Sequence, residues 1–338
     1  MRQRIPHSRP DVGREEERAA VRVLRSGQLA GGEEVGRFEL EMERFLGGGR
    51  ATAVHTGSAA LHLALLALGV KPGDHVLLPT YVCAAALNAV RYAGAEPILA
   101  DVEPSTANLD PSDVRRRLLR RTSAMIVPHM FGKAAPLKEL RRLGVPIVED
   151  CAMSLARGTG LGGEVSVFSF YATKMIATGQ GGMVVARDRR LHERVRDLVG
   201  YDEREDYAVR FNYRMSAIVA AVGRAQLRKA PVFLKRRRRI AEIYCRSLGR
   251  GAPPADHLFY RFVVRAGAVE PFVRSMAARG IECKRPVFRP LHRYFPGARG
   301  EYKGAEELHR SSASVPLYPA LRAGEVDRVA RALREELA

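Results

Sequence analysis

The stretch VFSFYATKMIATGQGGMVV (167–185) joins the end of one short apolar run to the start of another, with a lysine between them. The two runs, EVSVFSFY (164–171) and GMVVARD (182–188), are bounded by glycine and charged residues, which predicts two strands. Lys174 lies in the connection among small, aromatic and glycine residues, although most cations of this chain are arginine. A desolvated lysine amine can act as a base or a nucleophile, whereas arginine keeps its proton. This segment alone leaves a functional amine and an exposed loop lysine equally open.

Outward from this stretch, further short apolar runs alternate with helical patterns through the first two thirds of the chain. They are HVLLPT (75–80), AEPILADV (95–102), AMIVPHMFG (124–132) and VPIVED (145–150). This rhythm predicts βαβ units and a largely parallel sheet covered by helices. The last run ends in Glu149 and Asp150, and ligands of such sheets bind beyond the carboxyl ends of the strands. A carboxylate here is therefore a candidate functional acid, with a turn-capping role as the alternative.

The segment HTGSAALHLALLALG (55–69) predicts a helix with Leu61, Leu65 and Leu68 on one face. Gly57 and Ser58 stand at its start, where backbone N–H groups are unpaired and the helix dipole favours an anion. The helix start is a candidate phosphate site. A serine that only caps the helix is the alternative.

Composition indicates a globular protein. The 338 residues are 46% hydrophobic, enough for one large domain or two. No apolar run approaches the roughly 18 residues that cross a membrane, and the first ten residues are polar, so we expect a cytoplasmic protein without a membrane partner. The four cysteines form no CxxC pair, which predicts reduced core or near-core thiols and no metal site.

The formal charge of +19 raises the question of a nucleic-acid partner. The arginines are spread along the whole chain, and the densest run, LKRRRRIAEIYCRSL (234–248), has the apolar spacing of an amphipathic helix with a solvated basic face. We therefore predict no nucleic-acid partner, although the positive field favours a phosphorylated substrate.

The pattern changes near residue 235, where a long helix and a Gly/Pro-rich turn lead to LFYRFVVRAG (258–267), a predicted strand, and then to a predicted helix (269–279). We predict a large domain with an N-terminal arm at 1–235 and a smaller α/β domain at 236–338.

Several segments, taken in chain order, resemble one known family. They are TGSAALHLALLALGVKPGDHVLLPTY (56–81), EPILADVEPSTANLD (96–110), VPIVEDCAMSLA (145–156), FSFYATK (168–174), GQGGMVV (179–185) and FNYRMSAIVAAVGRAQL (211–227). They are similar to the DegT/DnrJ/EryC1/StrS family of sugar aminotransferases, which use pyridoxal phosphate. The resemblance implies the α/β fold of a fold-type-I transferase dependent on pyridoxal phosphate. That fold has a mostly parallel seven-stranded sheet with helices on both faces, and a smaller C-terminal α/β domain.

The resemblance also implies two catalytic residues. Lys174 matches the lysine that binds pyridoxal phosphate as a Schiff base and then carries a proton between cofactor and substrate. Asp150 matches the carboxylate that keeps the pyridine nitrogen protonated, so that the ring withdraws electrons. Relatives that act as dehydratases have histidine in place of this lysine, so Lys174 favours the aminotransferases.

Further positions match the family residues around the cofactor. Tyr81 matches the aromatic residue that stacks on the ring, and Asn212 matches an asparagine that reaches the phosphate from the neighbouring subunit. The resemblance therefore implies a homodimer with shared active sites. The implied cofactor-binding set is Gly57, Ser58, Ala59, Tyr81, Asp150, Met153, Ser169, Lys174 and Asn212.

The chain departs from the family where substrate is expected. Met153 replaces a polar residue, the stretch between Asp150 and Phe168 is short, and LVGYDERED (198–206) lacks a usual histidine. The segment GIECKRPVFRPLHRYF (280–295) resembles the variant found in members that aminate 4-keto-6-deoxy nucleotide sugars. The candidate substrate-binding residues are Arg214, Arg285, Arg289 and His292.

These observations predict a sugar aminotransferase dependent on pyridoxal 5'-phosphate. It would move an amino group from an L-amino acid, L-glutamate by preference, to a nucleotide-linked 4-keto-6-deoxy sugar. One alternative is an aminotransferase for a keto-cyclitol or a related antibiotic precursor. Another is a non-catalytic protein that retains the fold.

Overall fold

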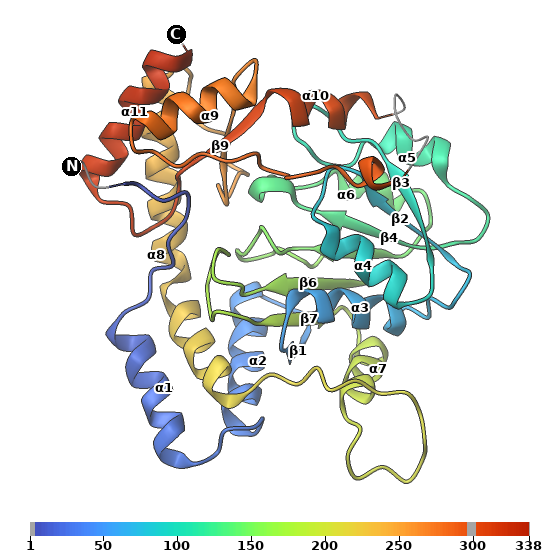
Figure 1. The fold of residues 1–338 in the computed structure, drawn as a ribbon. Helices are drawn as coiled ribbons and strands as arrows, with labels where there is room; N and C mark the ends of the chain where they lie inside the picture. Colours follow the sequence, from blue (N-terminus) through green and yellow to red (C-terminus); the bar gives the residue numbers. More distant parts are fainter. Residues whose placement is uncertain (1–3, 296–301, 338) are drawn as a thin grey trace.

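A computed structural model describes residues 4–295 and 302–337, and its centre is a seven-stranded sheet (Figure 1). The strand order is β1-β7-β6-β5-β4-β2-β3, and β7 is antiparallel to both of its neighbours while the other paired strands are parallel. The strands are β1 (Arg50–Val54), β2 (His75–Pro79), β3 (Glu96–Ala100), β4 (Thr122–Pro128), β5 (Ile147–Asp150), β6 (Val165–Ser169) and β7 (Gly182–Ala186). The predicted mostly parallel sheet is confirmed.

Helices cover both faces of this sheet, as predicted. The helices are α1 (Arg14–Ser26), α2 (Glu33–Leu46), α3 (Gly57–Ala67), α4 (Ala84–Tyr92), α5 (Pro111–Arg117), α6 (Leu137–Arg141), α7 (Arg189–Val199), α8 (Ala217–Ser247), α9 (Val269–Ala278), α10 (Lys303–Ser311) and α11 (Ala323–Leu337). Within the described residues, none of them combines the length and apolar character that crossing a membrane requires.

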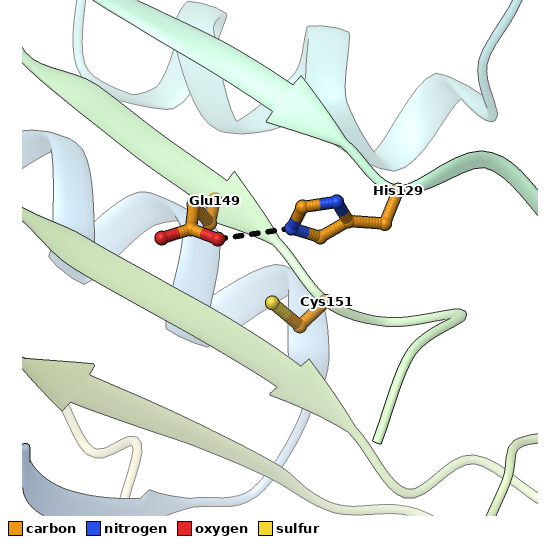
Figure 2. A group of neighbouring side chains, drawn as sticks. All are labelled: His129, Glu149 and Cys151. Carbon is orange, nitrogen blue, oxygen red and sulfur yellow. Dashed lines mark hydrogen bonds and ion pairs between the residues drawn. The ribbon is translucent and has the colours of Figure 1, made fainter. Parts of the chain in front are cut away.

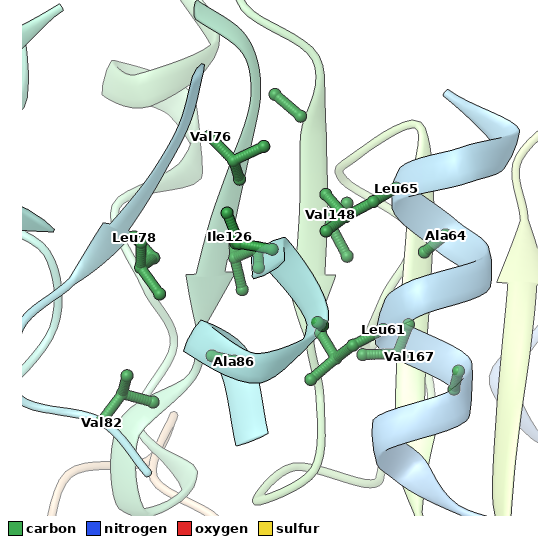
Figure 3. Close-up of a cluster of buried hydrophobic side chains, with 14 of the residues drawn as sticks. Leu61, Ala64, Leu65, Val76, Leu78, Val82, Ala86, Ile126, Val148 and Val167 are labelled. Atoms are coloured by element: carbon green, nitrogen blue, oxygen red, sulfur yellow. The ribbon is translucent and has the colours of Figure 1, made fainter. Parts of the chain in front are cut away.

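Alternation along the strands produces the two faces. Val76 and Leu78 of β2 pack with Leu61 and Leu65 of α3 in one core (Figure 3). Leu77, between them in sequence, lies in another core with residues of α5 and α6. Successive strand side chains point to opposite faces, so both sets are buried only because both faces carry helices.

Strand β1 did not stand out in the sequence. Its residues RATAV include only one large apolar side chain and a central Thr52. It is buried through its pairing with β7, where Ala51 lies opposite Val185 and Ala53 opposite Met183. Small residues suit this position because α2 packs closely against the strand.

The C-terminal residues form a second layer with its own core. Strands β8 (Phe262–Arg265) and β9 (Ser312–Val315) pair antiparallel, and residues of α8, α9 and α11 pack around them. The predicted strand at 258–267 is shorter because Phe259 has a left-handed φ of 52°. The predicted boundary at residue 235 lies inside the continuous helix α8, so the division into two domains stays a prediction.

Two expectations about individual side chains need correction. Arg237, in the run expected to form a solvated basic face, is only 3% exposed. Its Nη1 donates to the carbonyl oxygens of Phe259, Tyr260 and Leu317, each at 3.1 Å. Cys83 is exposed, whereas the other three cysteines are buried and all four are free thiols.

Candidate active site

The candidate site lies at the carboxyl ends of two neighbouring parallel strands, β5 and β6. Asp150 is the last residue of β5 and Ser169 the last of β6. Lys174 follows in a tight turn, where its N–H donates to the Tyr171 carbonyl at 2.8 Å. The turn closes before β7, since Ala172 N–H donates to the Gly179 carbonyl at 3.1 Å. Residues far apart in sequence thus meet at one edge of the sheet, as expected for a parallel arrangement.

Asp150 is a buried carboxylate, 6% exposed. Burial raises its pKa, while the Ala152 N–H on Oδ1, at 3.0 Å, and the positive charge of Lys174 oppose this rise. Desolvation disfavours the ionised form unless a cation lies close by. The position therefore suits a cationic N–H group of a ligand, such as a pyridinium.

Lys174 is half-buried, and its Nζ lies 5.4 Å from the centroid of the Tyr260 ring. Burial alone would raise the pKa of Tyr260, but the charges of Lys174 and Arg261 outweigh it and lower that pKa to about 8. The Tyr260 hydroxyl also lies 3.5 Å from Thr173 Oγ1. Sequence reasoning missed Tyr260, because LFYRFVVRAG was interpreted as strand throughout and contains no glycine or proline near Phe259 to signal the turn.

The start of α3 forms a cradle against Ser169. A Cβ atom built on Gly57 would lie 2.8 Å from Ser169 Cβ and 3.0 Å from its Oγ, so only glycine allows this approach. Thr56 caps the helix, and its Oγ1 accepts the Ala59 N–H at 3.1 Å. Ala59 therefore supports the helix start, while the Gly57 and Ser58 end remains suited to an anion such as a phosphate.

A buried hydrogen bond joins His129 to Glu149, the residue that precedes Asp150 in β5 (Figure 2). His129 Nε2 is 2.9 Å from Glu149 Oε2, and His129 Nδ1 accepts the Ala135 N–H at 3.0 Å. One ligand atom each of His129, Glu149 and Cys151 lie within 4.8 Å of one another. The first two already have hydrogen-bond partners, and burial, with the charges of Glu149 and Asp150, raises the Cys151 pKa well above its usual range. In this structure the group supports the ends of β4 and β5.

Two predicted site residues, Tyr81 and His292, are buried inside the protein. Tyr81 is fully buried in the core, and its role in stacking on a cofactor ring stays a prediction. His292 is 1% exposed; its Nδ1 lies 2.7 Å from Thr80 Oγ1 and its Nε2 2.7 Å from Glu306 Oε1. Both ring nitrogens are engaged, so His292 fastens the C-terminal segment to the end of β2 instead of offering a contact to a sugar.

The predicted substrate arginines are occupied in separate local contacts. Arg214 pairs with Asp202, and Arg285 pairs with Glu270. Arg289 donates to the Arg293 carbonyl at 2.5 Å and covers the Tyr294 ring. These contacts do not bring the three arginines together around Lys174, so their substrate roles stay predictions.

The remaining two predicted residues differ in exposure. Asn212 is exposed, in the segment that connects α7 to α8. Its role toward a neighbouring subunit stays a prediction. Met153 is half-buried, and its Sδ accepts the Phe131 N–H at 3.3 Å. The thioether thus has a partner within the protein, beside the end of β5.

A model of the DegT/DnrJ/EryC1/StrS aminotransferase family matches residues 10–334. The chain belongs to this family. The family relatives include GDP-perosamine synthase of Caulobacter vibrioides, which is 35% identical, with 90% of this chain and 91% of the relative covered.

Two solved structures share the fold over nearly the whole chain. TlmJ from Streptoalloteichus hindustanus superposes with a TM-score of 0.91 at 34% identity and covers 98% of both chains. DesV from S. venezuelae, solved with a ketimine intermediate, has a TM-score of 0.88 at 32% identity, covering 95% of this chain and 94% of DesV. Membership of the DegT/DnrJ/EryC1/StrS family confirms the sequence resemblance, the fold class and the prediction of an aminotransferase.

The cradle leads to a first prediction, that Gly57→Ala weakens the binding of pyridoxal phosphate. The added methyl group would press on Ser169, and overpacking of this kind costs about 1–3 kcal/mol. We expect the Kd for the cofactor, from a spectroscopic titration, to rise about tenfold. Gly36→Ala, on α2 with nothing within 4 Å of its Cβ position, is the matched control. Equal Kd values for both variants would place the phosphate elsewhere.

Proposed function

We propose that this family member uses pyridoxal 5'-phosphate to move an amino group from L-glutamate to a keto sugar linked to a nucleotide. The observation that carries the proposal is the position of Lys174 and Asp150 at one sheet edge, beside the Gly57–Ser169 cradle. An amine, a buried carboxylate and an anion site are the three groups that the aldehyde, the ring nitrogen and the phosphate of this cofactor require.

The residues of this chain would divide the work as follows. The cradle holds the phosphate, and Asp150 accepts a hydrogen bond from the protonated ring nitrogen. The bound cofactor supplies an electron-withdrawing ring. Lys174 holds the cofactor at rest and then moves a proton at the carbon that gains or loses the amino group. Tyr260 lies close enough to Lys174 for its hydroxyl or ring to orient the amine.

Names of relatives support the acceptor class. GDP-perosamine synthases of Caulobacter vibrioides, Escherichia coli O157:H7 and Vibrio cholerae are 35%, 32% and 35% identical to this chain. Their names point to a nucleotide-linked sugar. The formal charge of +19 also favours a substrate that carries phosphates. The exposed Asn212 is consistent with a homodimer in which one subunit completes the site of the other.

The test is a two-step assay on the full-length protein. Protein with pyridoxal phosphate is first treated with L-glutamate, and release of 2-oxoglutarate is measured. A panel of 4-keto-6-deoxy nucleotide sugars is then added, and amino sugars are detected by mass spectrometry. We expect glutamate-dependent formation of one amino sugar. Turnover of a keto-cyclitol with none of the nucleotide sugars would favour the cyclitol aminotransferase, and the absence of both half-reactions would contradict the proposal.

A further inference from the structure

A cavity of about 480 Å³ lies apart from the candidate active site, and its size is within the roughly 300–1,000 Å³ that small-molecule sites span. Its walls come from the loop after β3 (104–107), the segment after β4 (131–133), the end of α8 with the following loop (245–254) and the segment that contains β8 (257–265). Lys174, Asp150 and the cradle at α3 are outside this lining. A ligand bound here would therefore not contact the groups assigned to the cofactor.

Hydrogen bonds join the walls of this cavity to one another. The Leu258 N–H donates to the Gly132 carbonyl at 2.8 Å, which ties the segment before β8 to the segment after β4. Asn108, at the end of the loop after β3, accepts the Met130 N–H at 2.9 Å and donates to the Ala134 carbonyl at 3.0 Å. The cavity is therefore formed by the fold itself, as ligand sites usually are.

The backbone around the cavity is strained. Within the described residues, four non-glycine residues have a left-handed φ, and three of these four line this cavity. They are Ala107 (60°), Phe131 (58°) and Phe259 (52°). Conformations of this kind are unfavourable and concentrate at ligand and active sites. The strain thus supports a binding role independently of the cavity's size.

The charged residues that line the cavity are all cations, namely Lys133, Arg250, Arg261 and Arg265. Two of these four already have carboxylate partners. Lys133 Nζ lies 2.6 Å from Asp256 Oδ2, and Arg265 Nη1 lies 3.2 Å from Glu307 Oε1. The free positive charge of the lining is therefore that of the other two residues.

Arg250 and Arg261 are available to a ligand, since neither forms an ion pair within the described part of the chain. Arg261 Nη1 lies 3.1 Å from His7 Nε2, but burial lowers the pKa of His7 to about 3, so this ring is neutral. Arg261 Nε and the Ser312 hydroxyl are buried and have no hydrogen-bond partner among the described residues. Buried polar atoms are nearly always paired. Two unpaired ones around a single cationic cavity indicate an anionic ligand with hydrogen-bonding groups.

The remaining lining is apolar and includes three buried aromatic side chains, Phe131, Phe259 and Phe262, together with Leu308. Aromatic side chains stack favourably on the flat rings of nucleobases. An inorganic anion alone would leave this part of the cavity without a contact. The lining thus suits a ligand that has both an anionic end and a flat apolar body.

We propose that this cavity is a separate binding site for a free nucleoside diphosphate. Its phosphates lie at Arg250 and Arg261, since arginine binds phosphate oxygens through paired N–H groups. Its base lies against Phe131 and Phe259, and the Ser312 hydroxyl bonds to the nucleoside. The inference does not rest on the proposed function, because neither Lys174 nor the cofactor cradle takes part.

The test is calorimetric binding of adenosine diphosphate and uridine diphosphate, one purine and one pyrimidine nucleotide, to the full-length protein without cofactor. Arg250→Gln should raise the Kd at least about tenfold, because it removes a charged hydrogen-bond donor. Arg246→Gln, exposed at the end of α8 and outside the cavity, is the matched control and should leave the Kd unchanged. Ser312→Ala removes only a hydroxyl without a partner and should raise the Kd about fivefold.

Four outcomes would overturn the inference. Neither nucleotide may bind, or both may bind equally well to Arg250→Gln and Arg246→Gln. Pyrophosphate that binds as tightly as the nucleotides would show that the base makes no contact. Displacement by pyridoxal phosphate would place the nucleotide in the cradle at α3, and competition with the keto sugar in amino transfer would place it in the acceptor site. Absence of amino transfer would contradict the proposed function and leave the binding result intact.

Discussion

Replacing Lys174 with alanine is expected to abolish amino transfer, with a fall in rate of at least about 10³-fold. The amine of Lys174 has two duties in the proposed reaction, covalent attachment of the cofactor and movement of a proton. Its neighbours are Tyr260, with the ring centroid 5.4 Å from Nζ, and the buried Asp150. Neither of these residues carries an amine, so neither can take over the attachment of the cofactor.

The measurement is the visible absorption of protein with added pyridoxal phosphate, before and after excess L-glutamate. Wild-type protein should show a lysine-dependent band that L-glutamate changes, and Lys174→Ala should show only free cofactor. Lys138→Ala, on the exposed side of α6, is the matched control and should behave as wild type. A cofactor band that persists in Lys174→Ala would assign the attachment to another lysine and contradict the proposed site.

Local sequence patterns predicted six of the seven strands of the sheet, and the acid at its edge, because these depend on nearest neighbours in the chain. The run VPIVED shows where β5 ends, and the strand's position alone brings Asp150 to the edge. Small residues at the start of α3 likewise predicted the cradle. Burial by long-range partners is different. His292 looked available, but Thr80, 212 residues earlier, and Glu306 occupy its two ring nitrogens.

The burial of Arg237 shows the same limit, because it depends on partners that are distant in the sequence. Arg237 stands in a run of four arginines, and the sequence gives no reason to single it out. In the structure it is the member that turns inward, since the carbonyl of Leu317, 80 residues away, receives its Nη1. Local patterns also could not place Tyr260 beside Lys174. That position depends on the chain leaving the strand conformation at Phe259, just before β8.

Replacing Glu149 with alanine is expected to lower the free energy of unfolding by about 4 kcal/mol. The carboxylate is 1% exposed. Its Oε1 accepts the N–H groups of Gly162, at 2.6 Å, and Gly163, and its Oε2 contacts His129 (Figure 2). Alanine would leave three donors without an acceptor, two of them in the buried residues Gly163 and His129. Denaturant unfolding of the cofactor-free protein measures the loss, and Glu139→Ala, on the exposed face of α6, should change stability by less than about 0.5 kcal/mol.

The amide variant Glu149→Gln tests the protonation assigned to this network. Because the Ala135 N–H occupies His129 Nδ1, the ring proton lies on Nε2 and points to Glu149. Glutamine can turn its oxygen to His129 or to the two glycines, and its NH₂ group then faces a donor on the other side. Moving the ring proton to Nδ1 would only transfer that conflict to Ala135. Glutamine should therefore cost about 2 kcal/mol despite its matching shape. A variant as stable as wild type would mean that His129 accepts a hydrogen bond at Nε2, and the network would have to be reassigned.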